Sequence, residues 1–386
     1  MFVPQPPILR PLGHITPSIY EASIDCLAKA AWYALGARGA LPEHPAAMLG
    51  TAFHSVVAAA HRGELSVAAE SGRRLARQLF DSTSQSLYDQ LHPLTKLKYR
   101  TAAHMPYYNL HRERCALLAA RIASSASPGR RSTAEEPAQA GRPPRRTEFL
   151  LRSSDGLVAG RPDHIDGTSK TAVDYKSGYT PEDRAGFVSD SEARQLRLYA
   201  YLATENRIPI STGVIVRGDG HRCELPITDA DALAEADSAR RRLQELNAAI
   251  GRGSKFDELA SPSREHCRSC PCIPFCSSFW TAVQPEWQPD VGLHVEGEVL
   301  DVATCQTQGV SLTTLNVLVR SGTISAPRVC AEQIPTAWML VQGGAPLRDG
   351  DCVRIVHGRQ LITEDTKARI RIDKALTAVW VTPTRA

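Results

Sequence analysis

Hydrophobic positions recur at helical spacing through the first third of the chain. A helix is predicted over residues 16–36, because Thr16 suits an N-cap and Pro17 suits the first helical position. A second helix is predicted over about 46–61, and helical patterns continue to about residue 123. The N-terminal part of the chain is therefore expected to be mainly α-helical.

From residue 148 the hydrophobic period changes to two, which indicates strands. Three strands of one sheet are predicted at Glu148–Arg152, Leu157–Ile165 and Thr171–Lys176. The chain then predicts a helix at 191–204, a hairpin of Ser211–Val216 and His221–Ile227, and an amphipathic helix at 231–250 that buries Leu233, Ala239, Leu243, Leu246 and Ile250. This alternation predicts an α/β fold with a mixed sheet flanked by helices.

Two stretches differ from this core. Residues 124–147 are rich in Ser, Pro, Gly and Arg, and they are interpreted as a disordered insertion. After residue 286 the chain becomes β-rich, with strands predicted at Val295–Val302, Val310–Val319, Asp351–Val356 and Ala375–Val381. We therefore predict a first domain over 1–285 and a second, all-β domain over 286–386 that resembles an oligonucleotide-binding (OB) barrel.

Composition narrows the class of protein only modestly. The chain has 386 residues, of which 42% are hydrophobic and 22% charged, and its net charge of +4 permits nucleic-acid binding. No apolar stretch approaches the roughly 20 residues that span a membrane, and the N-terminus lacks the apolar core of a secretory signal. A cytoplasmic location is expected. The chain contains no nucleotide-binding P-loop motif.

An acidic pair and a lysine form the candidate catalytic group. Asp163 is expected to close one strand, while Asp174 and Lys176 lie two apart on the next strand and so share a face. Carboxylates bind hard divalent cations, and an ammonium stabilises the negative charge that develops on an attacked phosphate. The carbonyl of Tyr175 adds a further candidate ligand. This combination predicts metal-dependent phosphodiester hydrolysis.

Three residues elsewhere in the chain fit the same chemistry. His54, on an early helix, offers an imidazole that would complete the metal shell. Gln195 and Tyr199 are four residues apart on a predicted helix and therefore share one face. Both are expected to reach the attacking water or a substrate phosphate.

Four motifs occur in an order that resembles the PD-(D/E)xK nuclease superfamily, in particular its RecB-type exonuclease branch. They are GTAFH at 50–54, GRPDHID at 160–166, VDYKSG at 173–178 and QLRLYAYL at 195–202. The resemblance covers about residues 16–280 and implies a restriction-endonuclease-like core. It implies that His54, Asp163 and Asp174 bind Mg²⁺ or Mn²⁺, that Lys176 is catalytic, and that Gln195 and Tyr199 support the site. Asp174 stands where many members of the family have Glu.

Ten cysteines in a chain without an export signal favour metal binding over disulfides. Cys267, Cys270 and Cys276 lie close together in sequence. RecB-type relatives, including the AddB nuclease and the CRISPR-adaptation exonucleases, are similar in this segment. The resemblance implies a [4Fe–4S] cluster held by Cys26, Cys267, Cys270 and Cys276, which would join the two ends of the nuclease domain. The alternative is Zn²⁺ on Cys267, Cys270, Cys276 and either Cys272 or His266.

The sequence therefore predicts a metal-dependent deoxyribonuclease. An exonuclease that acts on single-stranded DNA or DNA ends, with an OB-like domain that grips the strand through basic and aromatic contacts, is the first interpretation. A catalytically silent DNA-binding or scaffold subunit is the alternative. Because the chain has no motor motif, a helicase or another DNA-processing protein is a candidate partner in either case.

Overall fold

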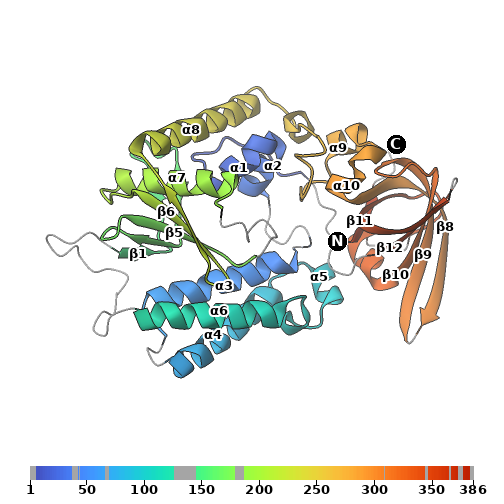
Figure 1. Ribbon diagram of the computed structural model, residues 1–386. Helices are drawn as coiled ribbons and strands as arrows, with labels where there is room; N and C mark the ends of the chain where they lie inside the picture. Colours follow the sequence, from blue (N-terminus) through green and yellow to red (C-terminus); the bar gives the residue numbers. More distant parts are fainter. Residues whose placement is uncertain are drawn as a thin grey trace.

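The computed structural model describes residues 6–36, 42, 44–65, 69–125, 145–178, 187–307, 309–343, 347–364, 367–372 and 377–382. Figure 1 shows a mixed sheet between two layers of helices, and a second sheet built from the C-terminal strands. None of the helices in these ranges is both long enough and apolar enough to cross a membrane.

A five-stranded sheet forms the centre of the first region. Its order is β1-β4-β5-β6-β7, formed by β1 (Arg145–Thr147), β4 (His164–Asp166), β5 (Thr171–Lys176), β6 (Thr212–Arg217) and β7 (Arg222–Pro226). The strands β5 and β6 are parallel, whereas the other neighbours are antiparallel. Helix α7 (Asp190–Glu205) makes the crossover that a parallel pair requires. The predicted mixed sheet is confirmed.

Helices cover both faces of this sheet (Figure 1). On one face lie α3 (Pro45–His61), α4 (Ala69–Asp89) and α6 (Tyr108–Ser125), whose core includes Val173 and Tyr175 of β5. The other face packs against α1 (Pro17–Asp25), α7 and α8 (Asp229–Gly251), whose core includes Ala172. Alternate residues of β5 therefore enter two different cores, because successive side chains of a strand point to opposite faces.

The prediction of one helix over residues 16–36 is wrong. Helix α1 (Pro17–Asp25) ends at Cys26, and α2 (Leu27–Leu35) begins directly after it. Cys26 is extended, with φ −163° and ψ 126°. The Ser261 hydroxyl donates to the carbonyl of Asp25, and the Ser261 N–H donates to Cys26 Sγ. A segment 235 residues away thus contacts the break, while the Cys26 N–H still donates to the carbonyl of Ala22.

The predicted buried face of α8 is partly wrong. Leu233 is 51% exposed, whereas Ala232 and Ala236 are buried together with Leu243 and Leu246. Helix α8 packs beside α7, and small side chains at this end allow the two helices to approach closely. The hydrophobic period gave the helix but not the residues that face α7.

The predicted strand Leu157–Ile165 is divided in two. β3 (Ala159–Gly160) pairs with β2 (Leu151–Arg152) in a separate two-stranded sheet, and β4 begins at His164. Pro162 lies between them and cannot donate a ladder hydrogen bond. Asp163 therefore precedes β4 instead of closing a strand. Of the predicted insertion 124–147, residues 126–144 lie outside the described residues, while α6 extends to Ser125 and Arg145–Thr147 form β1.

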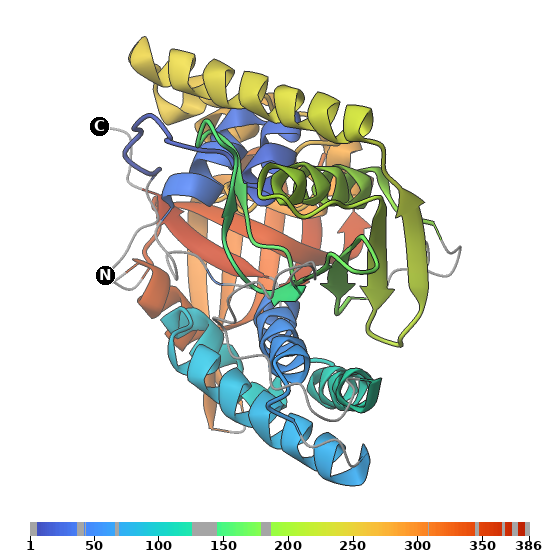
Figure 2. The same ribbon diagram turned by 90° about the vertical axis from the view of Figure 1, so that its left-hand side faces the viewer.

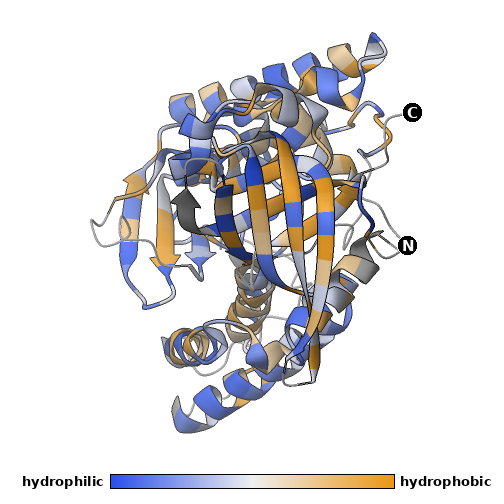
Figure 3. Ribbon diagram, turned by 90° about the vertical axis from the view of Figure 1, so that its right-hand side faces the viewer, coloured by the Kyte–Doolittle hydropathy of each residue, from blue (hydrophilic) through white to orange (hydrophobic). Residues whose placement is uncertain are grey.

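The C-terminal strands pair in a closed order. They are β8 (Leu293–Thr307), β9 (Val310–Gly322), β10 (Arg328–Pro335), β11 (Cys352–Glu364), β12 (Lys367–Ile372) and β13 (Ala378–Thr382). The pairings β8–β9, β9–β10, β10–β12, β12–β11 and β11–β8 close a ring of five strands, and β13 pairs with β11. Hydrophobic and hydrophilic residues alternate along these strands (Figure 3). Two of the strands, β10 and β12, were not predicted from the sequence.

The strand ring packs directly against the first region (Figure 2). Trp338, on α11 (Thr336–Gly343), and Trp380, on β13, belong to the same hydrophobic cluster as the core around α1, α7 and α8. Lys98, at the end of α5 (Pro93–Lys98), donates a hydrogen bond of 2.6 Å to the carbonyl of Thr377. The two regions therefore share buried contacts.

Candidate active site

Four separate elements bring the predicted catalytic residues together. Asp174 and Lys176 lie at the C-terminal end of β5, and Gln195 lies on α7. Asp163 lies in the connection before β4, and His54 lies in the middle of α3. These elements are distant in sequence and converge at one end of the central sheet.

Asp163 accepts contacts from both neighbouring elements. Its Oδ1 lies 3.0 Å from His54 Nδ1, and its Oδ2 accepts a 2.7 Å hydrogen bond from the Tyr175 N–H. The Tyr175 side chain points to the opposite face, where its hydroxyl lies 2.7 Å from His61 Nε2. Asp163 therefore fixes the position of α3 relative to β5.

Asp174, Lys176 and Gln195 form a closed polar network. Lys176 Nζ lies 2.7 Å from Asp174 Oδ2 and donates a 2.8 Å hydrogen bond to Gln195 Oε1. Gln195 Nε2 donates to Asp174 Oδ1 at 2.7 Å and contacts the Tyr199 hydroxyl at 3.1 Å. Gln195 thus holds both the acid and the lysine. Its spacing of four residues from Tyr199 places these two side chains on one face of α7, where they contact each other.

Burial and charge shift the pKa values of this group. Burial raises the pKa of Asp174 to about 6, against the opposing charge of Lys176 and with a further rise from Asp163. Burial lowers the pKa values of His54 and Lys176, but their acidic partners, chiefly Asp163 and Asp174 respectively, outweigh it and both values are raised. The acidic neighbours therefore favour the charged forms of His54 and Lys176, whereas burial favours the protonated form of Asp174.

Asp174 Oδ2 indicates that this acid fits a cation. The atom is buried and accepts no hydrogen bond from the part of the chain that the structure describes, although Lys176 lies close as an ion-pair partner. The Lys176 ammonium compensates this buried oxygen in the protein without a metal, and a divalent cation would supply the same compensation. Carboxylate oxygens and an imidazole on separate elements are suitable ligands for Mg²⁺ or Mn²⁺.

Glu148 belongs to the site and was missed by the sequence analysis. Ligand atoms of His54, Glu148 and Asp163 all lie within 4.8 Å of one another. Burial, followed by the charge of Asp163, raises the pKa of Glu148. Its φ of 54° is uncommon for a residue other than glycine, and such strained conformations are concentrated at functional sites. The only sequence signal was a charged residue at the start of a predicted strand.

A buried ion pair behind the site was also missed. Both guanidinium NH groups of Arg217, on β6, contact the carboxylate of Glu192, on α7, with the second hydrogen bond at 3.0 Å. Their side chains are 5% and 10% exposed. Arg217 is the register partner of Lys176, so this pair positions α7 beside the end of β5. Nothing in the local sequence distinguishes this arginine from an exposed one.

Two glycines in the sequence motifs allow helices α3 and α7 to lie close to the strands that carry the site. A Cβ on Gly50 would lie 3.1 Å from the Ser177 hydroxyl, directly after β5. A Cβ on Gly160 would lie 3.1 Å from the ring of Tyr199. Both distances are shorter than ordinary van der Waals contact, so these glycines let α3 and α7 reach the site.

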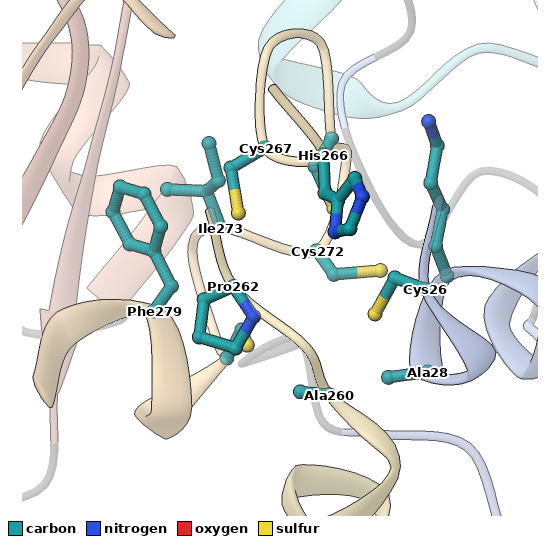
Figure 4. Close-up of a pocket in the computed structure, with 12 residues that line it drawn as sticks. Cys26, Ala28, Ala260, Pro262, His266, Cys267, Cys272, Ile273 and Phe279 are labelled. Carbon is teal, nitrogen blue, oxygen red and sulfur yellow. The ribbon is translucent and has the colours of Figure 1, made fainter. Parts of the chain in front are cut away.

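A second candidate site is a pocket lined by cysteines (Figure 4). Five thiols line it, together with Lys29 and His266: Cys26, Cys267, Cys270, Cys272 and Cys276. Cys26 and Cys272 extend toward the same part of the pocket (Figure 4). Cys26 reaches it from the break between α1 and α2, which corrects its predicted place within one helix.

The thiols of this pocket are suitable metal ligands. Cys272 is 1% exposed, and the three thiols expected from the sequence after residue 260 are 7–8% exposed. Burial raises the pKa of Cys267 and of Cys276 to about 12. A soft metal would provide the positive charge that these thiolates need in order to form at neutral pH.

The fold and the site together define a class of protein. Buried acids, a lysine and a histidine at the end of a mixed sheet are the features of a metal-dependent nuclease. Residues 14–277, more than half of the chain, match the family model of the PD-(D/E)XK nuclease superfamily. The chain belongs to this superfamily. No curated protein matches the chain significantly.

Proposed function

We propose that the protein is a metal-dependent deoxyribonuclease of the RecB type, acting as an exonuclease on single-stranded DNA or DNA ends. The observation that carries this proposal is the closed network of Asp174, Lys176 and Gln195 beside His54 and Asp163. All the residue types that phosphodiester hydrolysis requires are present, and the contacts of the network orient them.

The acids and the imidazole would hold the cation. His54, Asp163 and Asp174 are the proposed ligands, with the carbonyl of Tyr175, and the geometry adds Glu148 as a further carboxylate. Mg²⁺ or Mn²⁺ bound there would act as a Lewis acid and lower the pKa of a bound water. An imidazole binds metal in its neutral form. The proton that His54 shares with Asp163 would therefore be released when the metal binds.

Lys176 would orient the nucleophile and stabilise the charge that develops on the phosphate. Its contact with Gln195 would hold the ammonium in place when Asp174 serves as a metal ligand. Tyr199 supports Gln195 from the next helical turn, and it is buried. The two α7 residues therefore act mainly by positioning the lysine and Asp174.

The second candidate function is a catalytically silent DNA-binding or scaffold subunit. Such a subunit would not need Lys176 and Asp174 to be held at 2.7 Å, nor a buried acid with a raised pKa. Perturbed acids beside a lysine are typical of catalytic sites. Catalysis is therefore the better-supported function.

We propose that the cysteine pocket holds a [4Fe–4S] cluster on Cys26, Cys267, Cys270 and Cys276. Four thiolates on one zinc ion, each about 2.3 Å from the metal, would lie roughly 3.8 Å apart. Among the described residues, no three of these thiols lie within 4.8 Å of one another. The support for the cluster is that Cys26, at the break between α1 and α2, lines the same pocket as the three thiols after residue 260. Cys272 is then an additional thiol beside the ligands.

We further propose a nuclease domain over 1–285 and an OB-like barrel over 286–386. The strands pair in the order β8-β9-β10-β12-β11-β8, and α11 lies between β10 and β11 along the chain. Both features support an OB-like arrangement. DNA is the proposed substrate, and a helicase is the proposed type of partner. A cytoplasmic location follows as part of this proposal.

Cleavage of labelled DNA tests the proposed function. Purified protein with Mn²⁺ at pH 7.5 is expected to release products from 5′- or 3′-end-labelled single-stranded DNA, and none in EDTA. An RNA strand of the same sequence and a covalently closed circle are the matched substrates. Absence of metal-dependent cleavage of every substrate, by protein that still binds DNA, would favour the scaffold function.

The same assay has an expected pH dependence. Metal binding requires Asp174 to be ionised, and its pKa of about 6 lies between the two pH values compared, 5.5 and 7.5. At pH 5.5 about half or more of the metal-free sites are therefore protonated, so the Mn²⁺ concentration for half-maximal cleavage should rise several-fold relative to pH 7.5. Saturating Mn²⁺ should restore much of the rate. An Mn²⁺ requirement that does not change with pH would contradict this role of Asp174.

Optical absorption tests the cluster. Protein purified without oxygen is expected to be brown, with absorption at about 400 nm from thiolate-bound iron. Cys276→Ser and Cys26→Ser should lose this absorption, whereas Cys272→Ser and the exposed-control Cys305→Ser should retain it. A colourless protein that contains one zinc ion would overturn the assignment. Loss of iron in Cys272→Ser would show that Cys272 is a ligand in place of one of the four proposed cysteines.

A further inference from the structure

A basic surface covers the outside of three adjacent strands of the C-terminal ring. Its cationic side chains come from β10, β11 and β12: Arg328, Arg359, Lys367, Arg369 and Arg371. All four arginines are exposed and Lys367 is half-buried. The alternate residues Ala368 and Ile370 point into the ring and are buried. The period of two therefore sorts β12 into an apolar inner face and a wholly cationic outer face.

The strand pairing places like charges beside one another. Arg359 is the antiparallel register partner of Arg371, and Arg328 is the parallel partner of Lys367. Like charges directly opposite one another in a sheet are destabilising. Each of these two pairs also has an acid on the far side of β12, yet cations outnumber acids on this face.

Two described acids lie among them, Glu332 on β10 and Glu364 on β11, and Glu364 is the register partner of Lys367. Glu332, on β10, is the register partner of Arg371, and its carboxylate lies 3.9 Å from Arg369. Cys330, between them, is surrounded by the same charges: burial raises its pKa, and Lys367 and Arg369 oppose this rise. The five cations thus form one field, which the two acids compensate only in part.

The surface offers no Phe, Tyr or Trp on which bases could stack. The strands β10, β11 and β12 contain none of these residues, and Trp338 and Trp380 are buried. The predicted aromatic contacts of this domain with DNA are therefore absent from these strands. Arginine side chains recognise phosphate groups through their planar, charged donors.

We infer that the outer face of β10, β11 and β12 binds the sugar–phosphate backbone of nucleic acid through Arg328, Arg359, Lys367, Arg369 and Arg371, without reading the bases. The inference deepens the proposed function, since it assigns the substrate a second contact outside the catalytic site. It depends on a nucleic-acid substrate but not on hydrolysis. Binding should consequently be indifferent to sequence and strongly dependent on salt.

Equilibrium binding in EDTA tests the inference without cleavage. The triple variant Arg328→Gln, Arg369→Gln and Arg371→Gln is compared with a control triple whose arginines are also exposed. The control changes Arg74→Gln on α4, Arg241→Gln on α8 and Arg252→Gln at the C-cap of α8. Anisotropy of a labelled single strand is measured over a series of salt concentrations. The surface variant should bind about tenfold more weakly or worse, and its log–log salt slope should fall by roughly 2, at about 0.7 for each lost phosphate contact. The control should resemble the wild type.

Thermal unfolding distinguishes binding from a structural role. Removing like charges should leave the midpoint of the surface variant unchanged or raise it. DNA binding that matches the control triple would overturn the inference. So would unaltered DNA binding accompanied by lost binding to phosphatidylserine vesicles, which would indicate a membrane surface. If wild-type protein binds through this face but cleaves nothing, the hydrolytic function fails while this inference stands.

Discussion

Replacing Lys176 by alanine is expected to reduce DNA cleavage about 10³-fold, equivalent to about 4 kcal/mol of transition-state stabilisation. The ammonium lies 2.7 Å from Asp174 and is held by Gln195, so it is already oriented toward the site of reaction. An oriented donor requires little reorganisation when charge develops on the phosphate, which is why its removal is costly. Initial rates at saturating Mn²⁺ give the measurement.

Two comparisons make this expectation specific. Lys170→Ala removes an exposed lysine just before the other end of β5 and should leave the rate unchanged. In Lys176→Ala, Mn²⁺ titrated by calorimetry should still bind, because the proposed ligands remain. A Lys176→Ala protein that cleaves DNA at the wild-type rate would remove the lysine from the mechanism. Loss of folding would be visible in its thermal midpoint.

Replacing Arg217 by methionine is expected to destabilise the fold by about 3 kcal/mol, because it leaves Glu192 buried without its partner. For the nuclease part of the chain, this corresponds to a fall of roughly 6–12 °C in thermal midpoint. The paired arginine and the helix N-terminus outweigh burial and lower the pKa of Glu192 in the intact protein. In the variant the pKa should rise, and the deficit should shrink as the pH falls from 7 toward 5.

Matched variants separate this effect from simple loss of an arginine. Arg222→Met changes an exposed arginine on the neighbouring strand, whose ion pair with Glu224 is at the surface, and should shift stability by no more than about 0.5 kcal/mol. Adding Glu192→Gln to Arg217→Met should recover part of the loss, since the buried charge is removed. Equal stability of Arg217→Met and Arg222→Met at neutral pH would contradict the account.

The catalytic group shows how far local sequence information reaches. The spacing of Asp174 and Lys176 placed both on one face of a strand, and the spacing of Gln195 and Tyr199 placed both on one face of a helix. Those relations depend only on the period of a single element. The pairing of Gln195 with Asp174 and Lys176 depends on where α7 crosses the sheet, and the motifs indicated it only through their resemblance to a family.

Glu148 and Arg217 were not predictable in this way. Glu148 enters the site through an uncommon backbone conformation and a contact with the segment around Asp163. Arg217 is charged in a strand whose six residues are otherwise mostly apolar, and its partner Glu192 lies 25 residues earlier on α7. Neither side chain contacts a partner within its own segment. The spacing of residues along that segment therefore could not indicate its role.

The sequence by itself determined the class of fold, the order of most elements, the positions of the motif residues and the cysteine-rich segment, because periodicity and short spacing are local properties of the chain. The tertiary structure decided the break at Cys26, the entry of Glu148 into the site, the buried pair behind Lys176 and the cationic outer face of the ring. Each of these arises where elements distant in sequence meet, and there the partner across the contact fixes the position of a residue more strongly than its neighbours along the chain.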